Sequence, residues 1–113
     1  MKRKKVYVCA PFHGVSPEDR HRNEIKTGRR CRELYENGLH PVAPQLLYPR
    51  WLDEDDPKER ADGLSAALEW LEQCDVMYVY GEIVTEGMEK EIVFAKTHGI
   101  PIVRIPEHID EGA

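Results

Sequence analysis

One glutamate lies where the helical pattern of the chain calls for an apolar residue. Met88, Ile92 and Ala95 recur at positions i, i+4 and i+7, which is one stripe of an α-helix. The i+3 place on that stripe is Glu91. Burying a carboxylate without partners is costly, so this misfit indicates a functional role for Glu91. The alternative is a residue that only balances the helix dipole on a wider helix face.

A weakly hydrated carboxylate in the first turns of a helix has a definite chemistry. The helix dipole favours its ionised form, while burial opposes it. Such a carboxylate can attack the anomeric carbon of a sugar, where the transition state is oxocarbenium-like. Tyr7 could hold Glu91 by a hydrogen bond, although such a tyrosine is more often a core aromatic. Gly87, one helical turn before Glu91, would let a sugar approach the backbone closely.

The elements that position these residues alternate between strands and helices. Short apolar, β-branched and aromatic runs predict strands over residues 6–10, 40–43, 76–80 and 100–105. Helices are expected between them, and the alternation predicts an α/β fold with a mainly parallel sheet. Right-handed crossovers then favour a small doubly wound, Rossmann- or flavodoxin-like sandwich of about four strands in the order 2-1-3-4.

The expected helices have clear start and stop residues. Ser16 and Pro17 fit the N-cap and N1 positions of the first helix, and Asn37-Gly38 fits its end. Its expected inward stripe is Ile25, Gly28, Cys31, Leu34 and Tyr35. Asp56-Pro57 begins the second helix by the same logic, and Asp75 is expected to end it. The apolar face of that helix is Leu64, Ala67, Leu68 and Leu71. Gly99 is expected to cap the third, and residues 107–113 are expected to form a short, frayed polar tail.

Two turns are expected to meet at the carboxyl edge of this sheet. Ligands of doubly wound folds bind there, at the switch point between the first and third strands. The turn after the first strand supplies the candidate binding residues Pro11, Phe12, His13 and Gly14. The turn after the third strand supplies Gly81, Thr85, Gly87 and Met88. Backbone N–H groups near Gly14 could hold a phosphate, although this turn is not a Walker or Rossmann glycine motif.

A long segment without a regular pattern follows the second strand. Residues 44–56 read PQLLYPRWLDEDD, and long loops of this kind are often lids or binding loops. Tyr48 and Trp51 could stack on a base. The alternative is that both aromatic rings pin the loop to the core.

Composition excludes several classes of protein. The 113 residues fit one domain over residues 1–113, with 41% hydrophobic and 33% charged residues. We expect no membrane span and no signal peptide, and the net charge of −5 argues against general nucleic-acid binding. Three unevenly spaced cysteines indicate reduced thiols in a cytoplasm. Cys9 is expected to be structural, because no basic partner is placed to activate it. The histidines lack metal-ligand spacing, so neither a metal site nor a cofactor is expected.

Three segments together resemble the nucleoside 2-deoxyribosyltransferase superfamily. They are VYVCAPF, CDVMYVYG and TEGMEKEIVFAKTHGIPIV, and the resemblance covers nearly the whole chain in order. The chain is most similar to small relatives found in bacteria and their phages. The resemblance implies that a nucleoside or nucleotide is the partner, Glu91 the nucleophile and Tyr7 the residue that orients it. It also implies a homo-oligomer. Thr85 resembles the small polar residue of the nucleotide-hydrolysing N-glycosidase branch.

The sequence departs from this superfamily at one position. Ala67 stands where the characterised enzymes carry an aspartate that protonates or holds the base. Glu69 and Asp62 are the acids that could substitute, but Glu69 lies off the Ala67 face and neither is expected to take this role. Because a general acid supplies a factor of about 10²–10⁴, its loss would weaken or abolish catalysis. Three hypotheses therefore stay open: an N-glycosidase or deoxyribosyltransferase, a nucleotide-binding module without turnover, and an assembly part with a vestigial pocket.

Overall fold

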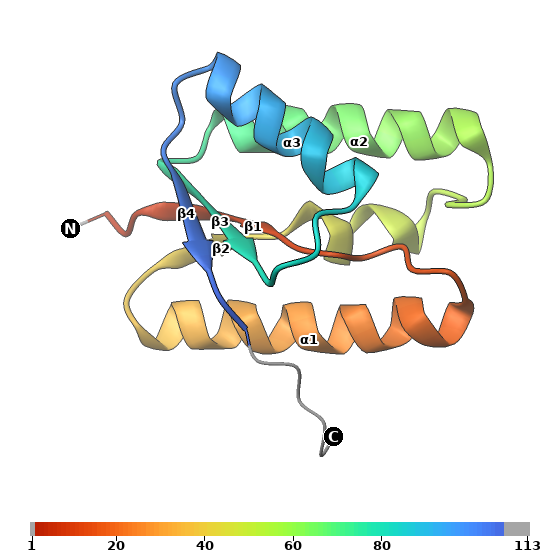
Figure 1. Ribbon diagram of the computed structural model, residues 1–113, viewed down its shortest axis with the longest axis horizontal. Coiled ribbons are helices and arrows are strands. Elements are labelled where there is room, and N and C mark those ends of the chain that lie inside the picture. Colours follow the sequence, from red (N-terminus) through yellow and green to blue (C-terminus); the bar gives the residue numbers. More distant parts are fainter. Residues whose placement is uncertain (1, 108–113) are drawn as a thin grey trace.

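A four-stranded parallel sheet forms the centre of the molecule (Figure 1). The computed structural model describes residues 2–107. The sheet order is β2-β1-β3-β4, and all three strand pairs are parallel. The strands are β1 (Lys5–Cys9), β2 (His40–Val42), β3 (Val76–Tyr80) and β4 (Ile102–Ile105). The predicted α/β class, strand order and doubly wound arrangement are therefore confirmed.

Helices cover both faces of the sheet. They are α1 (Pro17–Glu36), α2 (Pro57–Glu72) and α3 (Glu86–Thr97). Figure 1 shows α1 alone on one face and α2 with α3 on the other. None of the helices within residues 2–107 is both long and apolar enough to cross a membrane.

The side chains of β1 alternate between two apolar layers, as the period of two in a strand requires. Tyr7 and Cys9 belong to the cluster that includes Leu71 of α2 and Met88 of α3. Val6, Val8 and Ala10 belong to the cluster on the α1 side. We call these the α2/α3 layer and the α1 layer. Because β1 is buried on both faces, its residues form the nearly continuous apolar run seen in the sequence.

The helix starts agree with the sequence predictions. Ser16 caps α1, and its Oγ accepts a hydrogen bond from the Asp19 N–H. Asp56 caps α2 by accepting from the N–H groups of Lys58 and Glu59. Each cap satisfies donors that the first helical turn leaves unpaired. These caps fix where each helix leaves the carboxyl edge of the sheet.

The inward stripe predicted for α1 is wrong at three of its five positions. Ile25 and Tyr35 are exposed, with 44% and 51% of their surface accessible, and Gly28 is exposed too. The buried residues of α1 are Thr27 and Leu34. The helix therefore turns a more polar face to the sheet than its apolar residues indicate. The reason lies in polar contacts described below, which the apolar period cannot register.

Three smaller predictions also need correction. The segment predicted as irregular contains two short 3-10 helices, η1 (Pro44–Leu46) and η2 (Tyr48–Arg50). Asp75 does not end α2, because the helix stops at Glu72. The Asp75 Oδ2 atom instead accepts a hydrogen bond of 2.7 Å from the Lys5 N–H. The polar tail was predicted to fray from Glu107, but Glu107 is held by an ion pair with Arg30. The rest of that tail lies outside the described residues.

Candidate functional site

Glu91 lies on the sheet-facing side of α3, held by two residues of β1. Thr85 caps this helix, and its Oγ1 accepts a hydrogen bond of 3.2 Å from the Met88 N–H. The buried Met88 and Ala95 then seat α3 on the sheet, as the stripe predicted. This seating turns Glu91 toward β1, where the Tyr7 hydroxyl donates to its Oε2. The Cys9 thiol lies 3.6 Å from its Oε1.

The surroundings of Glu91 change its acidity. Burial raises the pKa of Glu91 to about 7, although the hydrogen bonds from Tyr7 and Cys9 act in the opposite direction. Burial and the nearby Glu91 charge raise the pKa of Tyr7 well above its usual value, and raise that of Cys9 too. Both β1 groups therefore stay protonated and act as donors. The result is a carboxyl group that changes between acid and base near neutral pH, which suits a nucleophile or a proton-transfer group.

The sequence prediction assigned no site role to Cys9. No basic residue was expected to activate it, and the structure places a carboxylate beside it instead. Its proximity to Glu91 follows from the parallel pairing of β1 with β3 and the seating of α3. A period-two reading could have found it, because Cys9 shares a strand face with Tyr7.

The turn after β1 is fixed by contacts with α1. The Asn23 side chain donates to the Phe12 carbonyl at 3.0 Å, and Arg20 donates to the His13 carbonyl at 3.5 Å. Gly14 has a φ of +68°, and a Cβ there would lie 2.5 Å from the Asp19 Cβ. No larger residue fits at Gly14 without moving the start of α1. Pro11 is half-buried.

The loop between β3 and α3 brings the other predicted residues to the same edge of the sheet. Gly81 has a φ of +81°, and its carbonyl accepts from Arg104 at 3.2 Å. Gly87 is half-buried with open space where a side chain would be. Met88 differs, because only 2% of its surface is accessible and its side chain packs in the core.

Tyr48 and Trp51 form an aromatic cluster with Trp70 of α2. The Tyr48 and Trp51 rings meet edge to face with centroids 5.3 Å apart. The Trp70 indole donates to the Tyr48 hydroxyl at 2.9 Å. Trp51 remains 59% exposed. This geometry matches the loop-pinning alternative for Tyr48, which ties η2 to α2.

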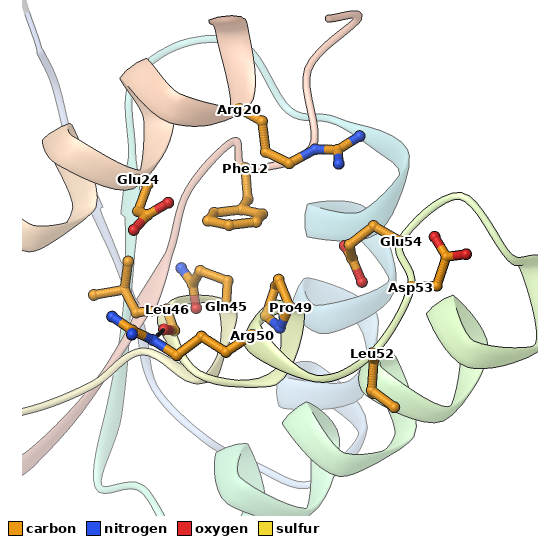
Figure 2. Close-up of a pocket in the computed structure, with 10 residues that line it drawn as sticks. All are labelled: Phe12, Arg20, Glu24, Gln45, Leu46, Pro49, Arg50, Leu52, Asp53 and Glu54. Atoms are coloured by element: carbon orange, nitrogen blue, oxygen red, sulfur yellow. Dashed lines mark hydrogen bonds between the residues drawn. The ribbon is translucent and has the colours of Figure 1, made fainter. Parts of the chain in front are cut away.

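A cavity of about 330 Å³ opens beyond the ends of β1 and β2 (Figure 2). Phe12 follows β1 and Gln45 follows β2, so the cavity lies at the carboxyl edge to which Cys9 and Glu91 also belong. The Gln45 amide nitrogen donates to the Val8 carbonyl at 2.9 Å, which fixes that side of the cavity. The lining residues are Phe12, Arg20, Glu24, Gln45, Leu46, Pro49, Arg50, Leu52, Asp53 and Glu54.

Most of these lining residues were not predicted from the sequence. Only Phe12 was among the candidate binding residues, and Tyr48 and Trp51 do not line the cavity. The acidic Asp53 and Glu54 occur at the end of the segment that was predicted as an irregular binding loop. Its position after a strand end was the available signal, but the direction of each side chain depends on η1 and η2.

The position of Ala67 leaves α2 without a carboxylate at that point of its buried face. Ala67 is 8% exposed. The two residues considered as substitutes are both exposed, and Asp62 forms an i,i+4 ion pair of 3.2 Å with Lys58. Neither Asp62 nor Glu69 lines the cavity.

The fold and this site define a small doubly wound α/β protein with a half-buried carboxylate at the carboxyl edge of its sheet. Residues 4–105 match the family described as a domain of unknown function, DUF7768. The chain belongs to this DUF7768 family. No curated protein sequence matches it significantly.

Two solved structures of enzymes are similar to this fold. One is a 2-deoxyribosyltransferase from the psychrotolerant bacterium Bacillus psychrosaccharolyticus, with 16% identity and a TM-score of 0.69 over 94% of this chain and 77% of that chain. The other is the CMP N-glycosidase BcmB of Clostridium botulinum, with 16% identity and a TM-score of 0.54 over 97% of this chain and 75% of that chain. At this identity, the likeness establishes a shared fold.

Proposed function

We propose that this chain, as a single nucleoside 2-deoxyribosyltransferase-like domain over residues 1–113, cleaves or transfers the N-glycosidic bond of a nucleoside or nucleotide. The observation that carries the proposal is the half-buried Glu91 carboxylate held by Tyr7 and Cys9. Ionised Glu91 attacks C1′ of the sugar, and the C1′–N bond breaks with its electron pair on the base. Water or a second base then takes the sugar from Glu91 and frees the carboxylate.

The two β1 donors have separate roles in this proposal. The Tyr7 hydroxyl holds Oε2, which orients the carboxylate and leaves the other oxygen, Oε1, to attack. The Cys9 thiol is a weaker donor to Oε1 and gives way to the substrate. The names of the two similar structures, a 2-deoxyribosyltransferase and a CMP N-glycosidase, support this class of reaction.

The proposed substrate lies between the two turns at the carboxyl edge. Residues 11–14 and the residues Gly81, Thr85 and Gly87 would surround the sugar and any phosphate, while Met88 supports them from the core. The open space at Gly87 favours this placement. Self-association into a homo-oligomer is part of the proposal, and sedimentation of the purified chain tests it. The cytoplasmic location stays a prediction.

A binding module without turnover is the second candidate function. Ala67 favours it, because the α2 face offers no carboxylate there to protonate a leaving base. A pure binder gains nothing from an unpaired carboxylate near C1′, whose burial is costly. The retained Glu91, Tyr7 and Cys9 cluster therefore favours the enzyme.

The decisive experiment is a chromatographic assay of base release and base exchange. Deoxynucleosides, ribonucleosides and their 5′-monophosphates are incubated with wild type, Glu91→Ala and the control Glu89→Gln. Glu89 is an exposed acid on the same helix. We expect turnover that falls at least about 10³-fold in Glu91→Ala and persists in Glu89→Gln.

The same samples separate the alternatives. Turnover that survives Glu91→Ala contradicts the assigned nucleophile. Absence of turnover, with thermal stabilisation of wild type by one of these compounds, identifies a binding module. Absence of both contradicts the proposed function.

A further inference from the structure

The cavity at the carboxyl edge of the sheet has both apolar and polar walls. Phe12, Leu46, Pro49 and Leu52 give it apolar walls. Its two arginines use part of their donor capacity within the protein: Arg20 contacts the His13 carbonyl and Asp55, each at 3.5 Å, and Arg50 Nε donates to the Leu46 carbonyl at 3.1 Å. A ligand in this cavity therefore meets apolar walls, the remaining arginine N–H groups and the acceptor oxygens of Glu24, Gln45 and Glu54.

Of the three carboxylates that line the cavity, that of Glu54 is the most removed from water. Its side chain is 14% exposed, and no hydrogen bond to it is found within residues 2–107. The His13 Nδ1 atom lies 3.9 Å from Glu54 Oε1, which is too far for a hydrogen bond. Burial, with Arg60 and Arg20 nearby, lowers the pKa of His13, so the ring is neutral and does not balance the Glu54 charge.

His13 Nδ1 is itself buried without a hydrogen-bond partner among the described residues. Because His13 Nδ1 and the Glu54 carboxylate are partly desolvated and form no hydrogen bond with each other, they lower the stability of the fold unless a ligand pairs with them. A ligand that brings N–H groups satisfies the carboxylate directly. This need for donors is the first argument about the ligand.

Other acceptors face the same space. Figure 2 shows the Glu24 carboxylate turned toward Phe12, while the Asp53 carboxylate points away from it. Gln45 uses its amide nitrogen on the Val8 carbonyl, which leaves its Oε1 as an acceptor. On the α2 side, Glu54 Oε2 lies 4.0 Å from the place a Cβ would take on Gly63. Glu54 thus supplies a carboxylate to the α2 side of the cavity from the preceding loop.

We propose that this cavity binds a base through an amino group directed at Glu54, so that cytosine, adenine and guanine are accepted and uracil and thymine are disfavoured. The inference rests on the proposed function for the identity of the ligand as a nucleoside or nucleotide. An exocyclic amino group donates to the carboxylate. The O4 carbonyl of uracil or thymine instead sets lone pairs against the negative charge of Glu54.

Deoxycytidine and deoxyuridine, with their 5′-monophosphates, are the sharpest probes. Cytosine carries an amino group at the position where uracil carries the O4 carbonyl. Each probe is titrated calorimetrically into wild type, Glu54→Gln and Glu89→Gln, and turnover of each is measured in parallel. Glu89→Gln makes the same change of carboxylate to amide at an exposed residue of α3 that does not line the cavity.

We expect wild type and Glu89→Gln to prefer cytosine over uracil by about 10–100-fold in affinity or in kcat/KM. Glu54→Gln should lose this preference, because an amide can turn either its oxygen or its NH₂ to the base. Thermal unfolding of each variant checks that the fold is retained.

The outcomes distinguish this inference from the proposed function. Turnover with the same base preference in wild type and Glu54→Gln overturns the role of Glu54 and leaves the glycosidic reaction standing. Binding without turnover, with a preference that Glu54→Gln removes, supports Glu54 and contradicts the enzyme. A wild-type preference for uracil, or no binding of any probe, overturns the inference.

Discussion

The two faces of the sheet are held in different ways. In the α2/α3 layer, helices and strands both contribute apolar side chains, and the Glu91 carboxylate is turned into it. In the α1 layer the strands supply most of the apolar surface, and α1 adds the buried Leu34 and polar contacts. Arg30 is the main one: it pairs with Glu107 at 2.6 Å and lies over the Tyr80 ring at 5.1 Å.

This difference separates a stabilising polar contact from a costly one. Arg30 of α1 and Glu107, which follows β4, form an ion pair in which the opposite charges balance and both side chains keep some contact with water. Glu91 has neutral donors and no cation within ion-pair distance in the part of the chain that the structure describes. A buried carboxylate that lowers the stability of the fold when ionised is typical of a functional site.

The largest expected effect is the pH dependence of stability caused by Glu91. Its pKa rises from 4.5 to about 7 on folding, so the folded chain holds this proton more tightly. Stability from this group is therefore lost as pH rises from about 4.5 to about 7, by roughly 3 kcal/mol in all. Glu91→Gln should be more stable than wild type at pH 8 and similar at pH 4.

Denaturant unfolding of both proteins across this pH range measures the effect. Glu89→Gln is the control, because Glu89 is exposed on the same helix. Equal pH profiles for wild type and Glu91→Gln would show that Glu91 ionises without cost and would remove the contrast between the two layers.

Arg30→Met should have the next largest effect. The Arg30 side chain is 11% exposed, and its removal leaves Glu107 without its partner and uncovers Tyr80. We expect a loss of about 2 kcal/mol in the free energy of unfolding. Arg29→Met, which changes an exposed neighbour, should be within about 0.5 kcal/mol of wild type. Equal losses in the two variants would mean that the Arg30 contacts do not hold α1.

A smaller effect is expected from Tyr7→Phe. The lost hydrogen bond is worth about 1 kcal/mol, and it stabilises the ionised form of Glu91. The pKa of Glu91 should therefore rise above its wild-type value, which an NMR titration of the labelled Glu91 carboxyl carbon measures. The control is Tyr35→Phe, since Tyr35 is half-exposed. An unchanged titration in Tyr7→Phe would contradict the orienting role of Tyr7.

The same contrast explains which parts of the fold could be predicted from the sequence. In the α2/α3 layer, apolar period and burial agree, so Met88, Ala95 and Leu71 were placed correctly. In the α1 layer the apolar period misled, because Arg30 and Thr27 occupy the face toward the sheet. A pattern of apolar residues cannot register contacts made by charged groups 77 residues apart in the chain.

In the candidate site too, the residues that break a regular pattern could be chosen from the sequence, and the others could not. Glu91 was proposed as a site residue because it breaks a regular apolar stripe, and Tyr7 because strand topology brings β1 beside α3. Cys9 and Glu54 break no pattern in the sequence. Cys9 resembles any core thiol, and the direction of Glu54 depends on η1 and η2, whose turns no periodicity predicts.

The smallest expected effect tests the orientation of α1 directly. Ile25 is 44% exposed, so Ile25→Lys should change the free energy of unfolding by less than about 0.5 kcal/mol. Leu34→Ala is the matched comparison on the same helix, because Leu34 is 6% exposed and its truncation should cost about 2–5 kcal/mol. Chemical denaturation of both variants gives the two values. A loss above 2 kcal/mol for Ile25→Lys would mean that α1 packs through its apolar stripe after all, and that the polar face assigned to the α1 layer is wrong.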